Sequence, residues 1–342
     1  MQFKGSWLQS SGRAHRMTLL DRRAFLHFTA GSAALVAVPK IATALDYPTR
    51  PVRMIVGLAA GGPTDSVARL IAQWLSEHMG NQFAVENRTG AGGTLATETV
   101  VNATADGYTL LFAGPTVTIS ALLYKKLANV LDQLSPVGLV ARAPNIMVVT
   151  PSLPVKTVKE FIDYAKANPG QISFASSGVG ASPHLSGEYF KFLTKTDMVH
   201  VPYRGSAAAY PDLMSGKVQV LFDNLGGPVL QMVHAGTLRA LGVTSAERWP
   251  LLPDVPAIAE TVPGYEIYVW YALFAPRGTP ADIVTKLNAA LKDAVADPKI
   301  LARFKDDGGV ATAMTPGVLA QFLADDEARW RKMVDAAGIT AE

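Results

Sequence analysis

Short apolar runs alternate along the chain with stretches in which apolar residues recur every three or four positions. Residues 52–58 form a mostly apolar run, which predicts a buried strand. Beyond it, apolar side chains recur at the spacing of one helix face: Val67, Leu70, Ile71, Trp74, Leu75 and Met79.

The same two patterns continue to the end of the chain and predict its fold class. Strand-like runs lie at 83–86, 108–113, 146–149, 172–175, 199–202, 218–222 and 238–243. Helical stretches lie near 94–103, 157–167, 183–194, 206–215, 226–235, 281–296 and 316–336. This alternation favours an α/β fold of mostly parallel sheets with helices on both faces.

Two segments divide the alternating pattern into lobes. A chain of 342 residues is long enough for about two domains. Residues 141–144 separate the first set of strands and helices from the second, and 244–256 are rich in proline and turn residues before a helix-dominated tail. We predict one lobe from 45–143 plus 245–342 and a second from 144–244, joined by two hinge strands.

The first 44 residues have the features of an export signal. Arg22 and Arg23 precede an apolar run at 24–38, and 42–44 read Ala-Thr-Ala. The run is shorter than the roughly 20 residues that cross a bilayer. We predict cleavage after Ala44. The segment is similar to a twin-arginine signal but departs from it at Asp21 and His27, so the Sec route and a start at Met17 stay open.

Charge and cysteine content exclude several function classes. The chain has 31 Lys and Arg and 28 Asp and Glu, and residues 1–44 hold six of the basic residues and one of the acidic ones. The rest of the chain therefore has 25 basic and 27 acidic residues. A body with a net charge of −2 has no basic excess for nucleic acid. The chain contains no cysteine, which excludes disulfides, thiolate metal sites and thiol catalysis.

Candidate chemistry lies where predicted strands end. Loops of Gly, Ser and Thr follow four of them, at 59–65, 89–94, 113–116 and 175–184. In parallel α/β sheets, ligands bind beyond the carboxyl ends of strands. Glycine exposes backbone N–H groups, hydroxyls add donors, and helix N-termini carry partial positive charge. The loops could simply cap helices, but their recurrence in both lobes favours an anion site.

The type of anion follows from motifs that are missing. No lysine follows Gly61 and Gly62 as a phosphate-binding loop requires, and the first strand–helix turn lacks G-x-G-x-x-G. A small carboxylate suits amides and hydroxyls without dense Lys or Arg. Arg204 could reach an anion or lie in solvent.

A hydrolase is the alternative from another class. Ser182 and His184 are close in sequence and Asp223 follows a strand, but G-x-S-x-G is absent. The spacing of His184 and His200 does not match a metal motif.

A set of ordered segments carries a family resemblance. They lie at 60–69, 86–94, 106–110, 176–185, 201–205 and 275–280. Over essentially all of 45–342 the sequence resembles the Bug family, the extracytoplasmic receptors of tripartite tricarboxylate transporters. The resemblance implies a type II-like periplasmic-binding-protein fold. It further implies closure on a carboxylate, delivery to a membrane permease, and no catalytic residues or cofactor.

The resemblance also implies binding residues on one loop of each lobe. The family usually has proline before the glycine pair, where this chain has Ala59 and Ala60, so the loop's detailed shape can differ. Carried over, the ligand-binding residues are Gly61, Gly62, Pro63, Thr64, Asp65, Ser176, Ser177, Gly178, Ser182 and His184, with Thr94, Thr116 and Asp223 as weaker candidates. Asp65 suits a helix cap or a ligand ammonium group.

We therefore expect an exported, periplasmic, monomeric receptor without cofactor or metal. A sensor that signals to a membrane kinase stays open beside transport, and the sequence does not identify the carboxylate.

Overall fold

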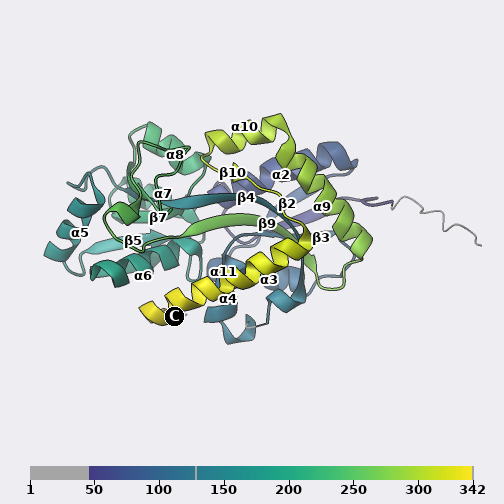
Figure 1. Cartoon of the computed structure of the whole chain (residues 1–342), viewed down its shortest axis with the longest axis horizontal. Coiled ribbons are helices and arrows are strands. Elements are labelled where there is room, and N and C mark those ends of the chain that lie inside the picture. The colour runs from purple at the N-terminus through teal and green to yellow at the C-terminus, as the bar shows by residue number, and fades with distance from the viewer. Residues whose placement is uncertain (1–45, 128, 341–342) are drawn as a thin grey trace, which may run out of the picture. The chain divides into compact units, whose positions relative to one another are not determined.

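The computed structural model describes residues 46–127 and 129–340, so the predicted export signal lies outside the described residues. Figure 1 shows the elements. The strands are β1 (Val52–Val56), β2 (Phe83–Asn87), β3 (Thr109–Ala113), β4 (Leu134–Val149), β5 (Ile172–Ser176), β6 (Met198–Pro202), β7 (Val220–Asn224), β8 (Arg239–Val243), β9 (Tyr268–Pro276) and β10 (Val310–Ala311).

Helices connect most of these strands. The α-helices are α2 (Pro63–Met79), α3 (Thr94–Val101), α4 (Thr116–Leu123), α5 (Val158–Ala167), α6 (Ser182–Thr194), α7 (Ser206–Met214), α8 (Gly227–His234), α9 (Ala281–Ala296), α10 (Pro298–Asp306) and α11 (Pro316–Ala337). Single 3-10 turns are η1 (Ala91–Gly93), η2 (Lys125–Leu127), η3 (Leu131–Gln133) and η4 (Ile258–Glu260). The predicted α/β fold is confirmed.

The strands form one hydrogen-bonded path in the order β2-β1-β3-β9-β4-β7-β5-β6, with β8 and β10 also paired to β4. The outer strands run parallel: β1 with β2 and β3, and β5 with β6 and β7. The pairs made by β4 and β9 are antiparallel. A strand that leaves one lobe and a strand that returns to it run in opposite directions, which explains this mixture.

The long strand β4 passes from one set of strands to the other. Its residues as far as Pro144 pair with β9, and from Asn145 it pairs with β7. At this crossing the Asn145 N–H donates to Thr244 Oγ1 (2.7 Å) and the Thr244 N–H donates to the Asn145 carbonyl (2.9 Å). The predicted lobe limits stay a prediction. Tyr265 and Ile267, which were assigned to the first lobe, pack into the core that contains β5 and β7.

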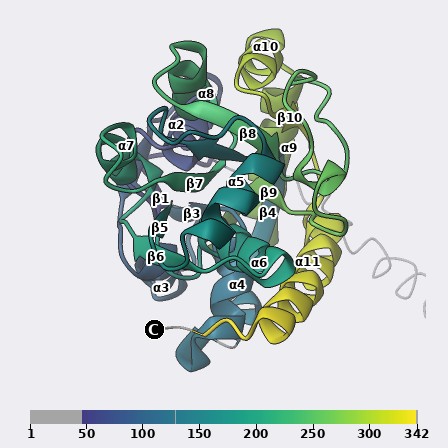
Figure 2. The same ribbon diagram turned by 90° about the vertical axis from the view of Figure 1, so that its left-hand side faces the viewer.

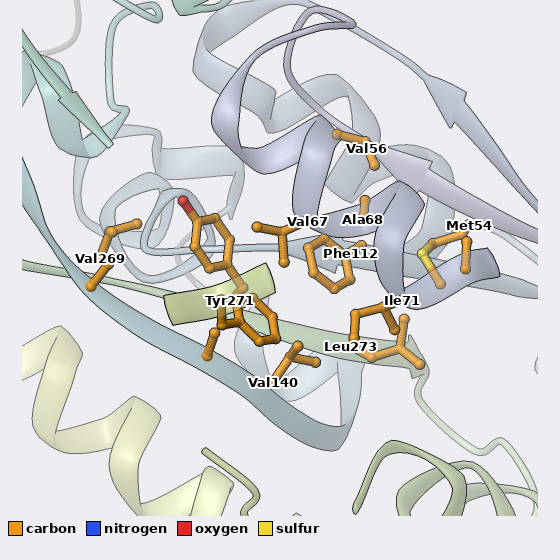
Figure 3. Packing of buried hydrophobic residues seen from close by; sticks show 14 of the residues in the cluster. Met54, Val56, Val67, Ala68, Ile71, Phe112, Val140, Val269, Tyr271 and Leu273 are labelled. Atoms are coloured by element: carbon orange, nitrogen blue, oxygen red, sulfur yellow. The ribbon is translucent and has the colours of Figure 1, made fainter. Parts of the chain in front are cut away.

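Buried apolar residues lie on both sides of the strands. Figure 3 shows Met54, Val56 and Phe112 from two strands against the apolar stripe of α2. Gly62 precedes α2, Pro63 occupies its first turn, and a left-handed Gly80 follows its last residue. The helix therefore begins at the end of β1, where the first predicted loop lies.

The last helix packs across both halves of the described chain. In Figures 1 and 2, α11 runs along α4 and its end reaches α6. Asp326 fixes this position because its buried carboxylate accepts hydrogen bonds from the indoles of Trp270 (3.0 Å) and Trp330 (2.9 Å) and from the Thr118 hydroxyl (2.8 Å). The loops that carry the predicted chemistry thus rest on a fixed frame.

Candidate ligand-binding site

Glycine-rich loops from the two sets of strands meet backbone to backbone. A Cβ atom added at Gly92 would lie 2.1 Å from the Val179 carbonyl oxygen, and one at Gly178 would lie 2.9 Å from the Gly92 Cα. One at Gly205 would lie 2.5 Å from the Ala59 nitrogen. Residues without side chains allow this approach, so the loops that follow β1 and β2 face those that follow β5 and β6.

A cavity of about 340 Å³ lies between these loops. Its size falls in the range of small-ligand sites. Of its lining residues in the described chain, Arg204 alone carries a charge. The lining residues are Gly57, Gly90, Gly92, Gly93, Tyr124, Ser177, Gly178, Val179, Pro202, Tyr203 and Arg204.

Two predicted residues, Ser177 and Gly178, line this cavity. Ser177 is 1% exposed, and its hydroxyl has no hydrogen-bond partner in the described chain. A buried hydroxyl without a partner is costly, because water no longer satisfies it. The Ser177 hydroxyl is therefore a group that a polar ligand or a water in the cavity could satisfy.

The loop at 176–180 is held from behind by side chains. Ser176 Oγ accepts the Gly178 N–H (3.1 Å) and lies 2.7 Å from His200 Nε2. His184 Nδ1 accepts the Gly180 N–H (3.3 Å). Ser176 and His184, both predicted to contact ligand, thus use these atoms to shape the loop.

Burial keeps the two histidines neutral. Their rings stack with centroids 4.2 Å apart. Burial, with a smaller effect from Lys191, lowers the pKa of His184 to about 4. Burial, then His184 and Lys191, lowers the pKa of His200 to about 3. At neutral pH this pair therefore presents hydrogen-bonding nitrogens and no charge.

Asp65 stabilises the turn between β1 and α2. Its buried carboxylate accepts hydrogen bonds from the Gly61 N–H (2.9 Å), Arg69 Nε (2.8 Å) and Asn87 Nδ2 (2.9 Å). Burial acts to raise the pKa of Asp65, but these three donors outweigh it and the pKa is lowered. Asp65 lies in the first turn of α2 and bonds Gly61, the residue before the N-cap, and the N-cap itself, Gly62, has no side-chain cap. The two roles assigned to Asp65 stay predictions.

Asp223 is fully buried beneath the start of α7. Its carboxylate accepts hydrogen bonds from Ser206 Oγ, from Tyr210 Oη (2.7 Å) and from the Asn224 N–H (2.8 Å). Burial raises the pKa of Asp223 to about 6, although these donors act in the opposite direction. Its oxygens are engaged within the protein.

The remaining predicted residues lie around the cavity without lining it. Thr64 and Thr116 line a smaller space of about 20 Å³, which shares Gly57 and Gly93 with the larger one. Ser182 Oγ donates to Asn224 Oδ1 (2.8 Å), and Thr94 Oγ1 lies 3.2 Å from Ser120 Oγ. Gly61 and Gly62 lie in the turn before α2, and Pro63 is the first residue of that helix. The roles assigned to these residues stay predictions.

Sequence reasoning did not select several residues that line the cavity. Gly57 directly follows β1, and Tyr124 directly follows α4, where its hydroxyl lies 3.5 Å from the Val179 carbonyl. Position alone did not reveal Tyr124, since packing between distant segments places it. Arg204 did carry a signal, because it lies two residues beyond the end of β6.

The geometry gives a hydrolase no support. Ser182 Oγ donates to Asn224, and His184 Nδ1 accepts the Gly180 N–H, so the serine and histidine of the hydrolase alternative bond to other groups in these contacts. Over the described ranges, no cluster of three or more His, Cys, Asp or Glu side chains suits a metal ion. No helix there is long and apolar enough to cross a membrane.

Comparisons with known proteins identify the family. Residues 67–339 match the model of the tripartite tricarboxylate transporter family receptor, TctC. The structure of Rpa4515 from Rhodopseudomonas palustris with adipate is 38% identical and has a TM-score of 0.83, over 86% of this chain and 99% of that one.

Two further solved structures agree. The periplasmic binding protein BugD is 34% identical with a TM-score of 0.83, over 86% of this chain and 100% of its own. MatC from Rhodopseudomonas palustris with bound malate is 34% identical with a TM-score of 0.80, over 84% of this chain and 100% of its own. These matches confirm the two-lobed periplasmic-binding-protein fold and a solute-binding receptor rather than an enzyme. The chain belongs to the receptor family of the tripartite tricarboxylate transporters.

Proposed function

We propose that this receptor binds a small organic carboxylate in the cavity between the glycine-rich loops and delivers it to a tripartite membrane permease. The observation that carries the proposal is the cavity of about 340 Å³. Its lining in the described chain combines the Ser177 hydroxyl, which has no hydrogen-bond partner there, the cationic Arg204 and the backbone of several glycines. Amides, a hydroxyl and one guanidinium form a donor-rich, acid-free lining, which favours an anion.

The relatives support the same chemistry. Rpa4515 was solved with adipate and MatC with malate, and both ligands are small organic acids. Closure of the two lobes around the ligand would bend the crossing segments near 141–145 and 243–247. The ligand would stabilise the closed arrangement by contacts that it makes only there.

Export completes the proposed function. The signal-like residues 1–44 would direct the chain to the periplasm and be removed after Ala44. The remaining chain would act there as a monomeric receptor. Mass spectrometry of the protein purified from a periplasmic extract would show whether it begins at Leu45.

A thermal-shift screen tests carboxylate binding directly. The purified receptor is heated with mono-, di- and tricarboxylates at about 1 mM, and with neutral sugars and amines as controls. Ligand at a hundred times its Kd should stabilise the fold by about 2.7 kcal/mol. A melting shift with sugars or amines, and none with any acid, would overturn the proposal.

A further inference from the structure

We propose that the receptor has a second ligand site, on the crossing strands β4 and β9, that binds a small aromatic carboxylate. The site is a space of about 330 Å³ lined by Arg142, Trp249, Tyr268, Val310 and Thr312. It shares no lining residue with either space at the glycine-rich loops. The inference therefore goes beyond the proposed function and does not depend on it.

Strand pairing brings the lining residues to one face of the sheet. Tyr268 of β9 is paired with Pro144, which lies two residues beyond Arg142 on β4. On the other side of β4, Val310 of β10 is paired with Arg142 itself, and Thr312 follows two residues later. Paired residues, and residues two apart on a strand, point to the same face of a sheet. The guanidinium, one ring, one apolar side chain and one hydroxyl therefore face the same space.

Trp249 closes one side of this space. It lies in the segment after β8, and its indole N–H donates to the Gly308 carbonyl (2.6 Å), which fixes the orientation of the ring. Its ring centroid lies 6.3 Å from that of Tyr268, with the two planes at 56°. Both side chains are half-buried. Two tilted rings form a corner against which a third ring can pack, since aromatic pairs favour offset and edge contacts.

Arg142 brings a positive charge to the same corner. Its guanidinium carbon lies 5.7 Å from the ring centroid of Tyr268 and 5.3 Å from that of Phe322 on α11. Within the described ranges, no ion pair joins Arg142 to an acid, and no carboxylate lines the space. The rings hold the guanidinium in place through their faces, and its N–H groups can still bind an anion.

A second arginine of the chain provides a comparison. Arg50 also lies over a tyrosine, with its guanidinium carbon 3.9 Å from the ring centroid of Tyr108, and it pairs with Asp106 at 2.9 Å. That site combines a ring with a carboxylate from the protein itself. The lining around Arg142 offers rings and no carboxylate, so a ligand that carries the acid would complete the same arrangement.

The lining also distinguishes between classes of ligand. An aliphatic acid would pair with Arg142 but would lose the ring contacts of Trp249 and Tyr268. A neutral aromatic molecule would leave the guanidinium without an anion, and a cation would be repelled by it. A volume of about 330 Å³ lies at the lower end of small-ligand sites, which suits one ring with a carboxylate.

Isothermal titration calorimetry on the purified receptor tests the inference with benzoate. Benzamide lacks the charge of benzoate, and cyclohexanecarboxylate lacks its aromatic ring. Arg142→Gln removes the charge of the site, Arg142→Lys retains it, and Trp249→Leu removes one ring. Arg50→Gln is the matched control, because Arg50 is stacked on a ring but already paired with an acid. Arg204→Gln distinguishes this site from the cavity between the loops.

We expect wild type to bind benzoate about ten-fold more tightly than benzamide and about three-fold more tightly than cyclohexanecarboxylate. R142Q should weaken benzoate binding about ten-fold, and R142K should retain part of the affinity. W249L should abolish the preference over cyclohexanecarboxylate and keep the preference over benzamide. R50Q and R204Q should leave benzoate affinity at this site within about two-fold of wild type.

Four results would overturn the inference. They are no binding of benzoate by wild type, equal affinity for the three probes, loss of benzoate binding in R204Q with none in R142Q, and an unchanged aromatic preference in W249L. Because W249L leaves the charge of Arg142 in place, it tests the site even if R142Q fails to fold. None of these results bears on the thermal-shift screen, so failure here and failure of the proposed function are distinguishable.

Discussion

The two loops that meet at the cavity obtain their shapes by different means. The loop at 90–93 contributes almost no side chains, and Gly90, Gly92 and Gly93 all have positive φ angles. The loop at 176–180 is instead held by Ser176, His184 and His200. The first loop depends on the absence of Cβ atoms, so substitutions there should affect contact between the loops. The second depends on a buried polar network, so its changes should affect stability and pH response.

The largest effect is expected from Gly92→Ala. The new methyl group would lie 2.1 Å from the Val179 carbonyl oxygen, and φ of +62° is unfavourable for alanine. The loops would have to separate, and affinity for the bound acid should fall about a hundred-fold, close to 3 kcal/mol. Calorimetry measures the affinity.

Gly80→Ala is the matched control for that prediction. Gly80 has φ of +78°, but nothing lies within 4 Å of a Cβ atom there. This variant should lose about 1 kcal/mol of stability and no affinity. Equal affinities in the two variants would show that contact between Gly92 and Val179 is irrelevant to binding.

The second prediction concerns how the stability of the fold depends on pH through His184 and His200, the histidines that support the loop at 176–180. His184 and His200 have pKa values lowered to about 4 and about 3, whereas an unfolded histidine titrates near pH ~6.5. Between about pH 6.5 and 4 the unfolded chain binds protons that the folded chain does not, so stability falls as the pH falls. Asp223, with its pKa raised to about 6, opposes this over part of the range.

Because two histidines oppose one aspartate, we expect the free energy of unfolding to be about 2 kcal/mol lower at pH 5 than at pH 7.5. Urea denaturation at the two pH values measures it. His200→Gln should remove a large part of the difference. A pH dependence that is the same in His200→Gln and wild type would contradict the prediction.

The sequence revealed the alternation of strands and helices but not the two strands that join the lobes. β9 was missed because Tyr268–Pro276 is almost continuously apolar and buried, and such a run has no period that separates a strand from a helix. Only the end of β4 was predicted. Pro136 and Gly138 interrupt its pattern, and the structure accommodates them with a shift of register.

The site was predictable where local sequence shapes it. Gly and Ser residues after β5 indicated Ser177 and Gly178, which line the cavity. Asp223 was selected for the same reason, its place after a strand, but burial and three donors engage it inside the protein. Which polar residue faces a ligand and which supports a loop depends on packing between distant segments, and one sequence does not show that packing.

A smaller effect is expected when the support of the second loop is cut. Ser176→Ala removes the oxygen that accepts the Gly178 N–H and contacts His200 Nε2, and it leaves both groups without this partner. Stability should fall by about 1–2 kcal/mol, measured by urea denaturation. Ser215→Ala removes an exposed serine hydroxyl and should cost less than about 0.5 kcal/mol. Equal losses would mean that the Ser176 network does not hold the loop.

The smallest effect should come from Tyr203→Phe, which loosens the segment that carries Arg204. The hydrogen bonds of Ser176 and His184 that hold the loop at 176–180 stay intact in this variant. The variant loses the hydrogen bond to Asp212, and Asp212 retains its ion pair with Lys217 at 3.1 Å. Affinity for the bound carboxylate should fall about three-fold, because the residue that precedes Arg204 is held less firmly beside the cavity. Tyr164→Phe on α5 is the control, and calorimetry provides the readout. An equal loss of affinity in Tyr164→Phe would show that the hydrogen bond to Asp212 does not help to position the guanidinium of Arg204.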